Sequence, residues 1–140
     1  MQFDACVLAG AFIIRLEPHR DDRGFFARSF CRREFAEYGL VHEVAQCNIS
    51  HNVRRGTLRG IHFQRAPYEE VKLIRCTRGA IYDVIVDIRP NSHTFRKWIA
   101  VELSAENGVA LYVPTGFGSL WNHLLIRAGC CLWTSRTVTQ

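Results

Sequence analysis

The sequence predicts an all-β domain, built as an antiparallel sandwich or barrel. Short segments that alternate apolar and polar residues recur along the chain, and turns rich in glycine, proline and asparagine separate them. Only residues 34–39 have the composition of a helix. The length of 140 residues, with a hydrophobic fraction of 48% and a charged fraction of 22%, fits one globular domain over 1–140.

The first half of the chain contains two expected strands and the short helix. Residues 5–14 are apolar around Gly10, which predicts a first strand interrupted at the glycine. This stretch is too short to cross a membrane, and no basic segment precedes it as in a signal peptide. EFAEYG, residues 34–39, predicts a helix that ends at Gly39. TLRGIHFQ, residues 57–64, reads as a strand.

Two strands with charged residues follow. VKLIRC, residues 71–76, is expected to place Lys72 on the face opposite its two apolar neighbours. AIYDVIVDIR, residues 80–89, is the clearest strand of the chain. Its alternation groups Asp83 and Asp87 on one face with two isoleucines, and puts a tyrosine and two valines on the other face.

The last third of the chain divides into a regular part and an atypical tail. Residues 97–104 and 109–113 predict strands, with a tight turn at 105–108 and a stop at Pro114. The tail, residues 119–140, contains no aspartate or glutamate, and its central part fits either a short buried helix or a pair of strands. This shift in composition predicts that the tail departs from the preceding fold.

Charge and cysteine content narrow the class of function. The net charge of +5 and the pI near 9.1 favour acidic partners such as phosphorylated small molecules. The basic residues form no long run and match no nucleic-acid-binding module, so nucleic acid is not expected as a partner. The six cysteines include no C-x-x-C pair, which disfavours a zinc site. Free thiols are typical of a reducing cytoplasm.

His62, within the strand TLRGIHFQ, has three possible roles. A lone histidine in a strand is most often a half-buried structural residue. A metal site on a strand would favour a second histidine two residues away, but Gln64 occupies that position. We therefore expect no metal here, and the structural role stays open beside a third.

The third role is that of a general base, for which the near-neutral pKa of imidazole is suited. A base that forms an enolate needs a cation near the oxygen that gains charge, and Lys72 or Arg59 could supply it, with Arg23 holding an anionic group. Alternation alone puts Arg59 and His62 on opposite faces of the strand. Gly60 between them could form a bulge that brings both to one side.

Several ordered segments together resemble the dTDP-4-dehydrorhamnose 3,5-epimerase family, over about residues 17–118. The matching segments are DRGFF (22–26), QCN (46–48), RRGTLRGIHFQ (54–64), VKLIRCTRGAIYDVIVDIR (71–89), SHTFRKWIAVELSAEN (92–107) and YVPTGFG (112–118).

The resemblance implies a cupin-type jelly roll that forms a cytoplasmic homodimer and uses no metal or other cofactor. It implies a step of dTDP-L-rhamnose synthesis, in which a dTDP-linked 4-keto-6-deoxy sugar is inverted at C3 and C5. Both carbons flank the C4 ketone, so their protons are the acidic ones. A base can remove each proton to form an enolate, and a proton then returns to the opposite face.

The resemblance also implies roles for individual residues. His62 matches the family's base, and Lys72 matches the cation that stabilises the enolate oxygen. Arg59 and Arg23 match positions that bind the diphosphate and nucleotide, where a planar guanidinium suits phosphate. The remaining substrate-binding positions are Phe26 near the thymine, Arg28, the polar trio Gln46, Cys47 and Asn48, and Ser119.

Some positions depart from the family pattern. Cys47 stands for an aspartate, Arg28 for a glutamate and Ser119 for a histidine. The family's proton-donating tyrosine falls at Leu132, and the aspartate that orients its base falls later than residue 140. We therefore expect a jelly roll that is incomplete at its C-terminus. The alternative function is a catalytically impaired nucleotide-sugar-binding paralogue, or a truncated product that lacks the proton donor.

Overall fold

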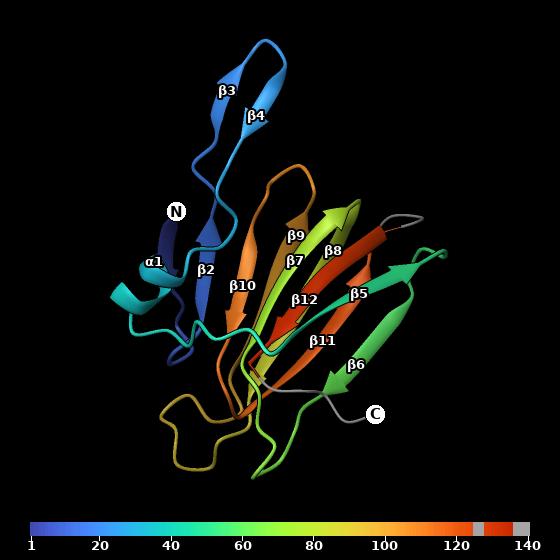
Figure 1. The fold of residues 1–140 in the computed structure, drawn as a ribbon. Helices are drawn as coiled ribbons and strands as arrows, with labels where there is room; N and C mark the ends of the chain where they lie inside the picture. Colours follow the sequence, from blue (N-terminus) through green and yellow to red (C-terminus); the bar gives the residue numbers. More distant parts are fainter. Residues whose placement is uncertain (125–127, 136–140) are drawn as a thin grey trace.

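Two antiparallel sheets face each other in the computed structural model, which describes residues 1–124 and 128–135 (Figure 1). The strand orders are β1-β2-β10-β7-β12-β5 in the larger sheet and β6-β11-β8-β9 in the smaller one, with β3 and β4 paired as a separate hairpin. This arrangement is the expected cupin-type jelly roll.

The elements have the following bounds: β1 Gln2–Ala5, β2 Phe12–Arg15, β3 His19–Asp21, β4 Gly24–Phe26, α1 Arg32–Glu37, β5 Gln46–Asn52, β6 Leu58–His62, β7 Lys72–Arg78, β8 Ala80–Asp87, β9 Trp98–Ser104, β10 Ala110–Val113, β11 Phe117–His123 and β12 Ala128–Thr134. Residues 5–14 therefore form parts of two strands, because the chain turns back near Gly10, whose φ is +88°.

The main core lies between the two sheets and consists of alternate residues of the facing strands. Strand β7 is buried on both faces, because its outer side is covered as well. There Leu73 packs in a second cluster with Phe35 of α1 and Trp133 of β12. The predicted helix is thus confirmed, and its Phe35 is fully buried.

The described part of the tail continues the sheets. β11 lies between β6 and β8, and β12 lies between β7 and β5. Of the two alternatives for the centre of the tail, the strand pair is correct, and the expectation that the tail departs from the fold is wrong for the described residues. The physical reason is burial: Trp121 and Cys130 point into the main core, and no acidic residue is needed there. The rest of the tail, 125–127 and 136–140, lies outside the described residues.

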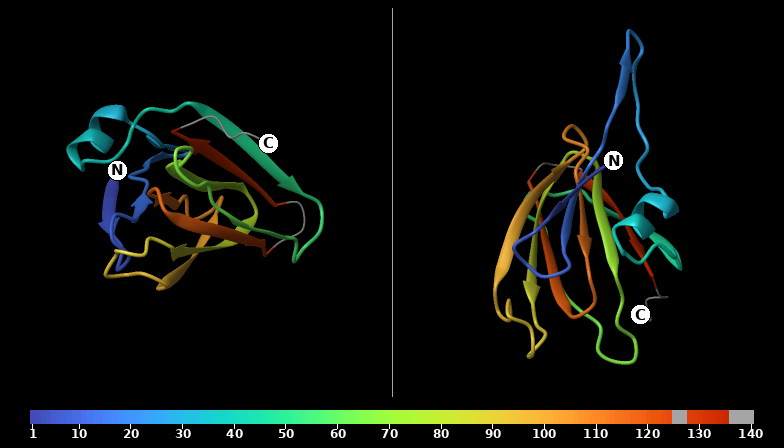
Figure 2. Two further views of the ribbon diagram at one scale, coloured as in Figure 1. Left: turned by 90° about the horizontal axis from the view of Figure 1, so that it is seen from below. Right: turned by 90° about the vertical axis from the view of Figure 1, so that its left-hand side faces the viewer.

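The β3–β4 hairpin projects from the body as an arm, at the end opposite the loop that joins β6 to β7 (Figures 1 and 2). Its aromatic side chains are exposed, with Phe25 at 55% and Phe26 at 78%. Exposed aromatic residues at the tip of an arm are typical of a contact surface. In the part of the chain that the structure describes, no helix has the length and apolarity to cross a membrane.

Candidate active site

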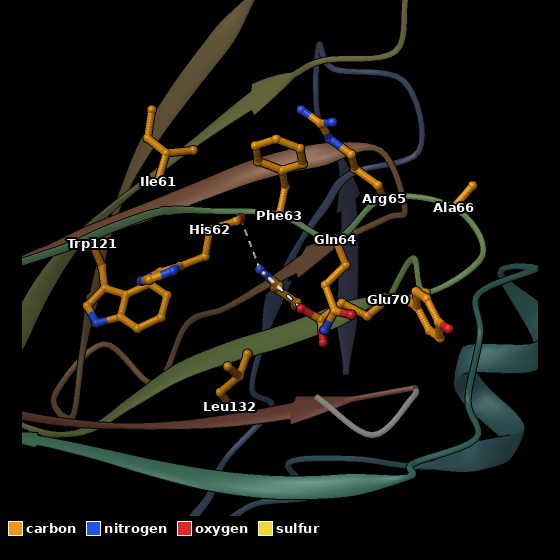
Figure 3. A pocket seen from close by; sticks show the side chains of 11 residues that line it. Ile61, His62, Phe63, Gln64, Arg65, Ala66, Glu70, Trp121 and Leu132 are labelled. Atoms are coloured by element: carbon orange, nitrogen blue, oxygen red, sulfur yellow. Dashed lines mark hydrogen bonds and ion pairs between the residues drawn. The ribbon is translucent and has the colours of Figure 1, made fainter. Parts of the chain in front are cut away.

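A cavity of about 550 Å³ opens between the sheets where β6 ends (Figure 3). Its size suits a small polar ligand. Strand β6, the loop after it, β7, β11 and β12 contribute its walls. The lining residues are Ile61, His62, Phe63, Gln64, Arg65, Ala66, Tyr68, Glu70, Lys72, Trp121 and Leu132.

The expected bulge in β6 is present. Arg59 pairs with Trp121 and His62 pairs with Ser119, so two residues of β6 stand opposite one residue of β11. Gly60 allows this, because its φ is +128° and a Cβ there would lie 2.7 Å from the Cα of Leu120. The bulge lets both Arg59 and His62 meet residues of the facing sheet.

His62 is exposed to the cavity, and its imidazole lies beside Trp121 with ring centroids 5.9 Å apart (Figure 3). The backbone oxygen of His62 accepts a hydrogen bond of 3.2 Å from Lys72 Nζ. The strand carrying the imidazole is thus tied to the ammonium group. A candidate base and a candidate cation share one cavity, as an enolising site needs.

Lys72 is held in place by burial and by the carboxylate of Glu70. Its residue is 4% exposed, and Nζ lies 3.4 Å from Glu70 Oε1, with both side chains only 5% exposed. Figure 3 shows the ammonium between the His62 carbonyl and Glu70. Among the described residues, neither Glu70 Oε2 nor Gln64 Nε2 has a hydrogen-bond partner. The cavity therefore presents polar atoms that a ligand can satisfy.

Asp83 is a site residue that the sequence prediction missed. It is fully buried on β8, opposite Trp121. Burial raises the pKa of Asp83 to about 7, against the opposing influence of the Lys72 ammonium and the Ser119 hydroxyl. Ser119 is also fully buried, and its hydroxyl lacks a hydrogen-bond partner within the described residues. The sequence pattern that could have indicated a buried acid here is the grouping of Asp83 with two isoleucines on one face of the strand.

Arg59 takes part in a polar contact inside the sandwich. Its Nε donates a hydrogen bond of 2.9 Å to Asn52 Oδ1 on β5. Asn52 Nδ2 in turn lies 2.6 Å from His123 Nε2 on β11. Asn52 is 5% exposed and His123 is fully buried. Nothing in the spacing of these residues along the chain indicated this contact.

The predicted polar trio on β5 is divided between two faces. Gln46 and Asn48 share a face with Asn52, and Gln46 Nε2 donates a 3.1 Å hydrogen bond to Asn48 Oδ1. Cys47 is exposed and points to the opposite face. Two members of the trio therefore point toward the interior between the sheets, and Cys47 points away from it.

Three other predicted positions lie away from the cavity, on or beside the arm. Arg23 has a side chain that is 90% exposed and pairs with Asp21 on the same hairpin. Phe26 is on the outer surface of the arm. Arg28 forms an ion pair with Glu34 of α1. Within one copy of the chain, these residues do not join His62 and Lys72.

Within residues 1–124 and 128–135, no group of three or more His, Cys, Asp or Glu residues could hold a metal ion. The six cysteines are all unpaired.

Comparison with protein families gives one match over most of the chain. The sequence model described as dTDP-4-dehydrorhamnose 3,5-epimerase matches residues 5–131. The epimerase of Sinorhizobium fredii is 44% identical over 121 residues, which cover 84% of this chain and 60% of that protein. The epimerase of Escherichia coli is 48% identical over 108 residues, which cover 75% and 58%. The chain thus spans about 60% of the length of these curated relatives.

Solved structures of the same enzymes are similar over the whole fold. The dTDP-4-dehydrorhamnose 3,5-epimerase of Bacillus anthracis, with TDP and PPi bound, gives a TM-score of 0.95 at 35% identity, covering 99% of this chain and 79% of that one. A dTDP-6-deoxy-D-glucose-3,5-epimerase of Legionella pneumophila, in complex with dTDP-4-keto-L-rhamnose, gives 0.91 at 31% identity, with coverages of 99% and 73%.

Proposed function

The chain belongs to the dTDP-4-dehydrorhamnose 3,5-epimerase family, and from this premise we propose that it is a 3,5-epimerase of dTDP-4-dehydro-6-deoxy-D-glucose in dTDP-L-rhamnose biosynthesis. The observation that carries the proposal is that His62 and Lys72, a candidate base and a candidate cation, line one open cavity. The match begins before the expected residue 17 and extends beyond residue 118.

His62 acts as the base in this proposal. Its imidazole faces the cavity and can accept the proton from C3 or C5 of a sugar bound there. Removal of either proton moves charge onto the C4 oxygen, and the buried Lys72 ammonium stabilises that enolate oxygen. Glu70 and the His62 carbonyl hold the ammonium, so little reorganisation is needed when the charge develops.

In this proposal one cation and two neutral amides bind the nucleotide part of the substrate. Arg59 supplies a guanidinium for the diphosphate, and Gln46 and Asn48 supply amides from the same inward face of β5. The net charge of +5 favours such an anion. The Bacillus anthracis relative with bound TDP supports a nucleotide diphosphate as the ligand.

A homodimer is part of the proposal, because the arm is remote from the cavity of its own chain (Figure 1). Arg23 and Phe26 on that arm are exposed and can contribute to the site of a second copy. Paired arms would also cover the exposed aromatic rings. We place the enzyme in the cytoplasm, which agrees with six unpaired cysteines.

The catalytically impaired binding protein remains the second candidate, and Leu132 favours it. Leu132 lines the cavity at the position where the resemblance puts the proton-donating tyrosine. Its side chain carries no proton that can be transferred. In that case the base is retained, and the return of a proton to the opposite face of the sugar is slow.

Solvent deuterium separates the two candidates. The chain is incubated in D2O with dTDP-4-keto-6-deoxy-glucose, and deuterium at C3 and C5 is followed by NMR. Incorporation at both carbons with inversion supports the epimerase. Tight binding of dTDP without inversion at either carbon, with or without deuterium incorporation, supports the binding protein. Absence of both exchange and dTDP binding would contradict the proposed function altogether.

A further inference from the structure

We propose that His123 and Asn52 are positioning residues that hold Arg59 ready for a diphosphate, and that they make this hold depend on pH. The inference rests on the proposed function, in which Arg59 contacts the diphosphate of a nucleotide sugar. Neither residue was a candidate from the sequence. They stand on different strands, β11 and β5, and meet Arg59 of β6 only in the folded sandwich.

The hydrogen bonds determine which atoms donate. Arg59 Nε donates to Asn52 Oδ1 over 2.9 Å, so the amide oxygen faces the guanidinium. The amide nitrogen then faces His123 Nε2 at 2.6 Å. An amide nitrogen can only donate, so Nε2 must accept and the imidazole must be neutral with its proton on Nδ1. One neutral histidine thus orients the amide, and the amide orients the arginine.

The contact leaves the reactive end of Arg59 available. It uses Nε and lies on the buried side, where Asn52 is 5% exposed. Arg59 itself is exposed, and its two terminal nitrogens form the planar fork that suits phosphate oxygens. A guanidinium held at Nε loses less side-chain entropy when a diphosphate binds than one that is free to rotate.

The surroundings of His123 favour its neutral form. Burial lowers its pKa, and the charge of Arg59 and the nearby His51 act in the same direction. The Nδ1 of His123 has no hydrogen-bond partner within the described residues. The titratable groups that act on His123 are Arg59 on β6 and His51 on β5. On β8, which pairs with β11, the nearest carboxyl to His123 is that of Asp83, opposite Trp121.

Protonation of His123 would break the arrangement. Both imidazole nitrogens would then donate, and Nε2 would meet the amide nitrogen of Asn52 as a second donor. Turning the amide over would satisfy His123 but would place Nδ2 against Arg59 Nε. The clash at His123 is relieved only by this turn, and Arg59 then loses its acceptor. We expect the affinity for a nucleotide diphosphate to fall, by up to about tenfold, as the pH drops from 7.5 to well below the ordinary pKa of histidine.

Calorimetric titration with dTDP-glucose tests this on the intact chain. The diphosphate of this probe is esterified at both ends, so it gains no proton over that pH range. The variant H123Q keeps a carbonyl that can accept from Asn52 but cannot titrate. We expect it to bind as the unaltered protein does at pH 7.5 and to show no fall at the lower pH. H123L, which cannot accept, should bind about tenfold more weakly at both pH values.

A second measurement needs no ligand. In the ¹⁵N spectrum of the free protein, the Arg59 Nε–H signal should shift as His123 titrates, and H123Q should remove the shift. An Arg59 signal that ignores both pH and H123Q would overturn the inference, as would an equal pH-dependent fall in affinity for H123Q. Failure of the unaltered protein to bind dTDP-glucose at pH 7.5 would instead overturn the proposed function.

Discussion

Two aspartates on one strand, four residues apart on β8, are treated in opposite ways. Asp83 and Asp87 share the inward face of β8, and both are fully buried. Asp87 accepts hydrogen bonds from Arg89, Ser92 and Thr94. Burial opposes ionisation, but these donors hold the pKa of Asp87 well below its usual range. Among the described residues, no donor has hydrogen-bonding geometry to Asp83. Burial raises its pKa to about 7, and the Lys72 charge and the Ser119 hydroxyl offset this only in part.

The difference separates a structural position from one beside the candidate site. At Asp87 the polar groups satisfy one another and anchor the loop after β8. Asp83 lies opposite Trp121, which lines the cavity. The lining residues Gln64 and Glu70 and the buried Ser119 each have a polar atom without a partner within the described residues. Buried polar groups that the fold leaves unpaired are typical of sites that a substrate completes. The following predictions test that division.

The largest effect is expected in the cavity, from replacement of the proposed base. Replacing His62 by Gln keeps a polar side chain but removes the imidazole that acts as the base. Exchange at C3 and C5 should fall roughly 10³-fold, since general-base catalysis typically contributes on this scale. The melting temperature should stay nearly unchanged, because His62 is exposed. A variant that exchanges deuterium at an undiminished rate would remove His62 from the mechanism.

Asp83 should make stability depend on pH. Its folded pKa of about 7 lies above the unfolded value of about 3.9, so its contribution to stability is full below pH 4 and is lost as the pH rises through 7. The loss amounts to about 4 kcal/mol. Replacing Asp83 by Asn should remove it, as measured by urea unfolding at pH 4.5 and 8. If the free energy of unfolding changed by the same amount between the two pH values in both proteins, the Asp83 carboxyl would have to be paired in solution.

Asp87 serves as the matched control with the opposite sign. Because its pKa is lowered in the fold, its stabilising contribution is present above pH 4 and is lost as the pH falls. Replacing Asp87 by Asn sets an amide nitrogen against donors from Arg89, Ser92 or Thr94. The free energy of unfolding at pH 7 should fall by about 3 kcal/mol. The rate of deuterium exchange at C3 and C5 of the substrate, per folded molecule, should be unaffected. A lower rate would show that Asp87 also supports the candidate site.

The smallest effect is expected from adding a hydroxyl to the cavity. Leu132 lines the cavity and is only partly buried, so a larger ring there can project into open space. Replacing Leu132 by Tyr should raise inversion about tenfold, within the range of general-acid catalysis. Leu132→Phe is the control, with the ring but no transferable proton. Equal rates in the two variants would show that the hydroxyl plays no part.

The alternation of residues already contained much of the fold. The strand at 80–89, the short helix near 34–39 and the strand with Lys72 all follow from local pattern, and the structure has them near the expected places. The tail resisted the same reasoning, because strands buried on both faces show no alternation. The departure predicted from the composition of the tail was therefore wrong, and periodicity could not correct it. Pairing of β12 with β5 and β7 decides the structure there.

The sequence by itself determined the family, the order of the family motifs along the chain, and His62 and Lys72 as the candidate base and cation. Each of these can be read from local segments of the chain. Only the tertiary structure decided which buried acid is paired, where Leu132 stands and how Arg59 is held. The reason is that burial and hydrogen bonding are set by contacts between strands far apart in the chain. Asn52 and His123 are 71 positions apart, yet their side chains lie 2.6 Å from each other.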